Sequence, residues 1–170
     1  MKFPIGIQDF KKIRQDGFVY VDKTALLYKM VNEGTIYFLS RPRRFGKSLL
    51  VSTLKYYFNG DKELFAGLAI ESLEKEWLQY PIFHIDFNGI DFSVGSMLQN
   101  KLDVCVEEWE RQYGIKGDAR NSVGERFAKV MKCAHRQTGR RCVVLIDEYD
   151  KPLLDVLDTG YMTKNDNGDE

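Results

Sequence analysis

Apolar positions along this chain follow two periods, one typical of helices and one typical of strands. Steps of three and four residues predict helices over roughly residues 7–15, 23–33, 46–58, 94–113 and 121–138, with two short helices within 61–80. Short, continuous apolar runs predict strands over 36–40, 82–87 and 142–147. Strands that alternate with helices are typical of an α/β protein, so the pattern predicts a parallel sheet with flanking helices and right-handed crossovers.

The length of the chain and its polar end set the expected domain boundaries. The chain has 170 residues, 44% of them hydrophobic, which suits one domain of ordinary size with a buried core. The regular pattern stops after residue 157, and residues 158–170 are mostly polar. We therefore expect one domain over residues 1–157 and a disordered tail over residues 158–170.

Net charge and cysteine content narrow the class of protein. The 25 basic and 25 acidic side chains cancel, so no global field draws the chain to nucleic acid or to a membrane. Nucleic acid stays open as a partner because positive charge is concentrated locally at Arg41, Arg43 and Arg44. Three cysteines without metal-ligand spacing, and an N-terminus without a long apolar segment, predict a cytoplasmic protein with no signal peptide or membrane span.

Residues 43–48, Arg-Arg-Phe-Gly-Lys-Ser, lie between a predicted strand and a predicted helix. This is the context that a P-loop requires, although Arg41 replaces the first glycine of the usual pattern. Lys47 would reach the outer phosphates of a nucleotide, the Ser48 hydroxyl would bind Mg²⁺, and the amides that open the helix would face the phosphates. The predicted nucleotide-binding residues are Arg43, Arg44, Phe45, Gly46, Lys47, Ser48 and Leu49, and Lys47 is also predicted to be catalytic.

Two carboxylates end the predicted strand 142–147 and form the second candidate motif. Ligands bind at the carboxyl ends of strands in open α/β sheets, so Asp147 would hold the Mg²⁺ together with Ser48. Glu148 would orient and deprotonate the water that attacks the γ-phosphate. The simpler interpretation is a core strand whose carboxylates only begin the next turn. The two motifs occur in the right order, each after a predicted strand, which favours a P-loop NTPase.

Three other charged segments have simpler interpretations that stay open. Arg43 and Arg44 either form a solvated turn or line a surface that binds an acidic partner or nucleic acid. The Asp22-Lys23-Thr24 segment is typical of a helix start. The Asp150-Lys151 pair is expected to end a turn and to form a surface ion pair worth under about 1 kcal/mol.

Four sequence blocks give the chain a family resemblance. They are residues 20–24 (YVDKT), 41–49 (RPRRFGKSL), 80–81 (YP) and 146–153 (IDEYDKPL). Together they resemble the AAA-ATPase-like family, whose bacterial and archaeal members often carry a C-terminal PD-(D/E)XK nuclease-like domain. The resemblance reaches to about Gly160. It implies that ATP is the nucleotide, that arginine is an expected variant at position 41, and that Lys47, Ser48, Asp147 and Glu148 carry the roles given above.

The resemblance also implies a sheet with more strands than this chain supplies. P-loop ATPases with such an acidic pair usually place a sensor strand between the P-loop strand and the acidic-pair strand, and it follows the acidic pair in sequence. Unpaired buried backbone groups along that slot would cost about 1–3 kcal/mol each. We therefore expect the N-terminal part of a longer protein, truncated before the sensor strand. The alternatives are that the tail, a neighbouring chain or direct pairing of the flanking strands closes the slot.

Two classes of function follow from these motifs, and a third stays open. The first is a three-layer, AAA-like NTPase module that binds ATP and Mg²⁺ and couples hydrolysis to a conformational change in an attached domain. The second is a nucleotide-binding or protein-interaction module that cannot hydrolyse ATP, because the sensor strand and an arginine finger are missing. The third, a small-molecule kinase, requires an acceptor pocket and lid that the sequence does not reveal.

Overall fold

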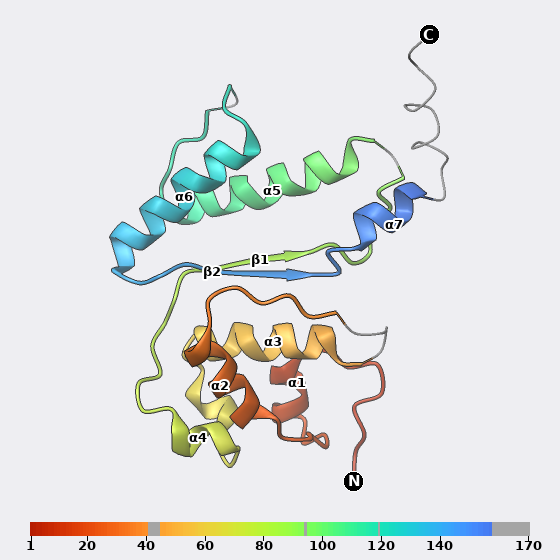
Figure 1. Ribbon diagram of the computed structural model, residues 1–170, viewed down its shortest axis with the longest axis vertical. Helices are drawn as coiled ribbons and strands as arrows, with labels where there is room; N and C mark the ends of the chain where they lie inside the picture. The colour runs from red at the N-terminus through yellow and green to blue at the C-terminus, as the bar shows by residue number, and fades with distance from the viewer. Residues whose placement is uncertain (41–44, 94, 119, 158–170) are drawn as a thin grey trace. The chain divides into compact units, whose positions relative to one another are not determined.

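The computed structural model describes residues 1–40, 45–93, 95–118 and 120–157. The chain divides into an N-terminal unit, Met1–Ile82, and a C-terminal unit, Phe83–Glu170 (Figure 1). The tail expected at residues 158–170 lies outside the described residues. None of the helices formed by the described residues has the length and apolar character needed to cross a membrane.

Short helices around an aromatic core form the N-terminal unit. They are α1 (Phe10–Gln15), α2 (Thr24–Glu33), α3 (Lys47–Phe58), the 3-10 helix η1 (Lys62–Phe65) and α4 (Ala69–Leu73). Each predicted helix is present, although α1 is shorter than expected because Asp9 caps it, accepting a hydrogen bond from the Lys12 amide at 2.7 Å. The buried core residues include Phe10, Leu27, Leu64, Phe65, Leu68 and Ile70.

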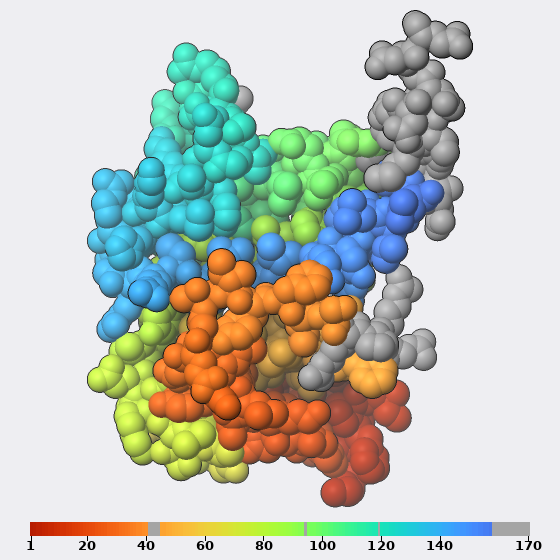
Figure 2. Space-filling view, viewed as in Figure 1, coloured from red at the N-terminus to blue at the C-terminus, as the bar shows by residue number. Residues whose placement is uncertain are grey.

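The strand predicted over residues 36–40 is wrong. The segment has no regular secondary structure, and it lies at the surface (orange in Figure 2) with Ile36, Tyr37 and Phe38 at 92%, 54% and 72% exposure. The described part of its unit contains no other strand with which it could pair. An apolar, aromatic run favours an extended backbone, but only a ladder with a neighbouring strand makes it a β-strand.

Asp22 joins the starts of two helices in the N-terminal unit. Its Oδ1 atom accepts hydrogen bonds from the amide and the hydroxyl of Thr24, at 2.8 and 2.7 Å, at the start of α2. Its Oδ2 atom accepts one from the Ala69 amide at 2.7 Å, at the start of α4. Burial opposes ionisation of Asp22, but these hydrogen bonds outweigh it and lower the pKa of its carboxyl. The helix start predicted within Asp22-Lys23-Thr24 is confirmed, although the N-cap residue is Lys23 and not Asp22, and the structure adds the second helix.

The described residues of the C-terminal unit form two strands and three helices. The strands β1 (Ile82–Asp86) and β2 (Val143–Asp147) pair side by side in one parallel sheet. The helices α5 (Met97–Gln112) and α6 (Val123–Thr138) cover one face of it, and α7 (Lys151–Leu157) follows β2 (Figure 1). Both strands and the two long helices agree with the sequence prediction to within three residues at each end. The shared core includes Phe83, Ile85, Val106, Trp109, Val130 and Ala134.

The continuous apolar run of β2 suggested a strand that is buried on both faces. In the structure only one face of β2 is buried. Leu145 is buried, whereas Val144 and Ile146, on the alternate face, are 41% and 46% exposed. Side chains of a strand alternate between the two faces of its sheet, and α5 and α6 cover only one of them. The mixed helix and sheet composition confirms an α/β chain, but the described residues form a sheet of two strands.

A buried ion network links α5 to α6. The Arg126 guanidinium donates to both carboxylate oxygens of Glu110, with Nη2–Oε2 at 2.7 Å and Nε–Oε1 at 3.1 Å. Its Nη1 atom also lies 2.8 Å from Oδ1 of Asp103. Hydrogen bonding to Glu110 raises the pKa of Arg126, which keeps the guanidinium charged. This fork fixes the relative register of the two helices that cover the sheet.

Two glycines of the C-terminal unit should respond in opposite ways to replacement by alanine. A Cβ atom on Gly117 would lie 2.6 Å from Oε2 of Glu110, and Arg126 holds that carboxylate in place. We expect Gly117→Ala to lower the free energy of unfolding by about 1–3 kcal/mol. A Cβ on Gly124, in the first turn of α6, meets no atom within 4 Å. We expect Gly124→Ala to raise stability by about 0.5–1 kcal/mol.

Urea denaturation of both variants beside the parent chain measures these two changes. Equal effects of the two substitutions would contradict the assigned contact between Gly117 and Glu110.

Candidate functional site

The start of α3 has the backbone geometry of an anion-binding site. Gly46 is the N-cap residue in the left-handed conformation, with φ of 75° and ψ of 25°. The Leu50 amide donates to the Gly46 carbonyl at 3.0 Å, so the first intrahelical hydrogen bond closes there. The amides ahead of Leu50 therefore lack intrahelical acceptors and point out of the N-terminal end of this 12-residue helix. Such an end attracts a phosphate through its amides and its dipole.

The predicted phosphate-binding side chains lie at this helix start. Lys47 and Ser48 are half-buried, and neither side chain has a hydrogen bond or ion pair with any residue in the described part of the chain. Phe45 is exposed, and the Leu49 side chain packs against the N-terminal core, so only its backbone could face a phosphate. The predicted contacts of Arg43 and Arg44, and the variant position Arg41, lie outside the described residues.

Helix α3 is held in place by α1, through contacts that the sequence pattern did not reveal. The Phe10 amide donates to Oγ of Ser52 at 2.9 Å. The Tyr56 hydroxyl donates to Oδ2 of Asp9 at 2.9 Å. Burial and then this bond to Asp9 raise the pKa of Tyr56 to about 12. The α1 helix thus fixes the scaffold of the candidate P-loop, with Asp9 acting as both its cap and its link to α3.

The acidic pair at the end of β2 has an unusual backbone. Asp147 is buried, and its Oδ1 atom accepts a hydrogen bond from the Glu148 amide at 3.0 Å. Glu148 has a φ of 52°, the left-handed conformation, and among the described residues it is the only non-glycine residue with a positive φ. This conformation costs an ordinary residue about 1–2 kcal/mol. Backbone outliers of this kind cluster at functional sites, which supports a functional role for Glu148.

The segment after the acidic pair is a helix, α7, that the sequence pattern did not predict. The predicted ion pair between Asp150 and Lys151 is wrong. The Lys151 ammonium pairs instead with Asp155, four residues along the helix, at 2.6 Å. The reason is geometric, because side chains four residues apart lie on one face of a helix, whereas adjacent ones point in different directions.

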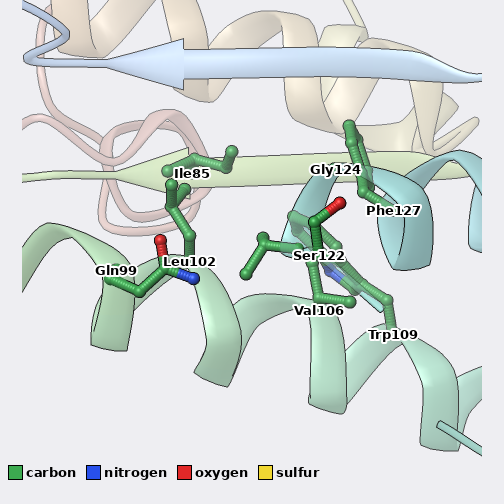
Figure 3. A pocket seen from close by; sticks show the side chains of 9 residues that line it. Ile85, Gln99, Leu102, Val106, Trp109, Ser122, Gly124 and Phe127 are labelled. Atoms are coloured by element: carbon green, nitrogen blue, oxygen red, sulfur yellow. The ribbon is translucent and has the colours of Figure 1, made fainter. Parts of the chain in front are cut away.

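A mostly apolar cavity of about 420 Å³ lies in the C-terminal unit between α5, the start of α6 and β1 (Figure 3). Neither Asp147 nor Glu148 lines it, so it is separate from the acidic pair. Within the described ranges, no three His, Cys, Asp or Glu residues cluster as a ready metal site. The lining residues are Ile85, Gln99, Leu102, Val106, Trp109, Ser122, Val123, Gly124 and Phe127.

The two halves of the predicted site belong to different units of the structure. Lys47 and Ser48 lie in the N-terminal unit, and Asp147 and Glu148 lie in the C-terminal unit. Each half has its expected local position, at a helix start and at a strand end respectively. Their convergence on one nucleotide stays a prediction.

Comparison with known proteins places the chain in a family. A family profile described as a predicted AAA-ATPase matches residues 4–167. A protein of Azotobacter chroococcum mcd 1, described as an uncharacterized protein in the vnfD 5' region, is 43% identical over 157 residues, which cover 92% of this chain and 30% of that protein. The chain therefore spans less than a third of that relative's length. No solved structure matches this chain. Because the profile covers almost the whole chain, the protein belongs to the predicted AAA-ATPase family.

Proposed function

We propose that this chain carries the nucleotide site of a P-loop ATPase, which binds ATP with Mg²⁺ and hydrolyses it. The observation that carries the proposal is the start of α3, where the left-handed Gly46 directly precedes Lys47 and Ser48, whose side chains have no partner in the described part of the chain. Family membership supports nucleotide binding in general. The adenine base and the nuclease-like domain are proposals that rest on the family resemblance.

The available side chains suit a nucleotide with its magnesium ion. Mg²⁺ prefers oxygen ligands and usually takes only one or two from the protein beside phosphates and water. The Ser48 hydroxyl and the Asp147 carboxylate are ligands of this kind, and we propose that they hold it. The bound ion would neutralise charge on the β- and γ-phosphate oxygens.

The protein groups have distinct roles in the proposed hydrolysis. Lys47 and the first amides of α3 bind and orient the phosphates. Glu148 accepts a proton from the attacking water, whose oxygen bonds to the γ-phosphorus as the bond to the β,γ-bridging oxygen breaks. ADP and inorganic phosphate leave. We propose that this change of ligand moves an attached domain in the intact protein.

A nucleotide-binding module without hydrolysis is the second candidate. The sheet formed by the described residues has two strands, and no sensor residue or arginine finger is assigned. Sensitive measurement of phosphate release distinguishes the two functions. Release that depends on Glu148 supports the ATPase, and binding without release supports the second candidate.

Replacement of Lys47 by alanine tests the nucleotide site. A hydrogen bond between charged groups contributes about 1.5–3 kcal/mol, so we expect Lys47→Ala to weaken ATP·Mg²⁺ binding by roughly 10- to 100-fold. Lys55→Ala is the matched control, because Lys55 is exposed near the other end of the same helix. Isothermal titration calorimetry measures both affinities. Unchanged binding in Lys47→Ala would end the proposal.

A further inference from the structure

The turn that presents Glu148 leads directly into α7. The Lys151 amide donates to the Glu148 carbonyl at 3.0 Å, and the Leu154 amide donates to the Asp150 carbonyl at the same distance. Glu148 itself holds the unfavourable left-handed conformation. A conformation of this kind persists only where the surrounding structure fixes it. Helix α7 is therefore the element that can hold or release the turn at Glu148.

One carboxylate of α7 anchors that helix to the segment that follows β1. Oδ2 of Asp155 accepts a hydrogen bond from the Phe92 amide at 3.0 Å, across 63 positions of sequence. The same oxygen lies 2.6 Å from the Lys151 ammonium. That ammonium lies 5.9 Å from the centre of the Phe92 ring, within range of a cation–π contact. Asp155 and Lys151 are both largely shielded, at 21% and 29% side-chain exposure.

The anchor point is itself firmly packed next to the acidic pair. Phe92 is buried, and its ring meets the edge of Phe87 with centroids 5.6 Å apart. The Phe87 amide donates to the Asp147 carbonyl at 3.3 Å. The contacts thus form a closed path from Asp147 through α7 and Phe92 back to Asp147. A path of this kind leaves the turn at Glu148 little freedom to move.

We propose that Asp155 is a positioning residue for Glu148, which it holds in place by fastening α7 to the Phe92 amide. This proposal rests on the proposed function, in which Glu148 activates the attacking water. A simple i,i+4 ion pair between Lys151 and Asp155 would act only within α7 and would not tie that helix to another segment. Such an ion pair does not require the long-range hydrogen bond from the part-buried Phe92 amide to Asp155. This bond ties α7 to the core.

Asp155→Ala removes the anchor, and Asp155→Asn keeps an acceptor for Phe92 while removing the charge that faces Lys151. Small displacements of a reacting group lower turnover by as much as about 100-fold. We expect Asp155→Ala to lower kcat by at least about tenfold with KM for ATP·Mg²⁺ unchanged, and Asp155→Asn to keep most of the activity. Glu33→Ala is the control, because Glu33 forms an exposed i,i+4 pair with Lys29.

Amide hydrogen exchange gives a readout that does not depend on catalysis. In Asp155→Ala, we expect exchange to speed up both at Phe92 and at Lys151, whose amide reports the Glu148 turn. Faster exchange at Phe92 alone, unchanged kcat, or an equal loss of kcat in Asp155→Asn would overturn the proposal. If the parent chain and Glu148→Gln turn over ATP equally, the assigned base is wrong. The exchange data then still decide whether Asp155 holds the turn.

Discussion

Glu148→Gln should bind ATP·Mg²⁺ with near-parental affinity while its turnover falls by about 100-fold or more, the size of a typical general-base contribution. Glutamine keeps the shape of the side chain and can still accept a hydrogen bond from water, but it cannot take the proton. The backbone contacts of residue 148, to the Asp147 carboxylate and the Lys151 amide, do not involve its side chain. Phosphate release at saturating ATP measures turnover, and calorimetry measures affinity.

Glu148→Gly separates the chemistry of Glu148 from its backbone conformation. Glycine adopts a φ of 52° without the steric cost borne by glutamate, so the free energy of unfolding should stay the same or rise while turnover is lost. Glu108→Gln, at an exposed position of α5, is the control and should keep its turnover. Full turnover in Glu148→Gln would refute the assignment of the base.

Arg126→Met should be the most destabilising substitution in the α5–α6 pair. It leaves the buried Glu110 carboxylate without its cation and removes three hydrogen bonds. Breaking a fully buried pair costs about 3–5 kcal/mol. Asp103 is 35% exposed and lets water reach one end of the network, so we expect a loss of about 2–3 kcal/mol in the free energy of unfolding.

Two further variants test whether the loss comes from the stranded charge. Adding Glu110→Gln to Arg126→Met removes that charge and should recover part of the stability. Arg120→Met breaks an exposed pair with Asp118 and should leave the urea midpoint unchanged. A double variant that is less stable than Arg126→Met would show that the buried carboxylate is not the cause.

The helices could be predicted from sequence because their signals are local. Ser122 and Glu125 form a capping box at the start of α6, and Gly139 ends it in the left-handed conformation.

The strand prediction for residues 36–40 failed because a strand depends on a partner elsewhere in the chain. Helix α7 was not predicted because its seven residues span too few turns for a periodic pattern to stand out, and its Leu153, Leu154 and Leu157 are exposed. Pro152, tolerated in a first helical turn, was the available signal.

The candidate site divides in the same way. Lys47, Ser48, Asp147 and Glu148 could be named from sequence because each stands in a short motif at the end of an element. The residues that hold these motifs in place could not, since Ser52 bonds to Phe10 and Asp155 bonds to Phe92 across long stretches of chain. Only the folded backbone brings such pairs together.

The double role of Asp22 has a consequence for how the N-terminal unit comes apart. Its carboxylate bonds to the first residues of α2 and, 47 positions further along the chain, of α4. Fraying at either helix end would break a hydrogen bond of this shared carboxylate and weaken its hold on the other end. Heating or denaturant should therefore open both helix starts in a single cooperative step. In thermodynamic terms, the YVDKT block couples the unfolding of α2 to that of α4.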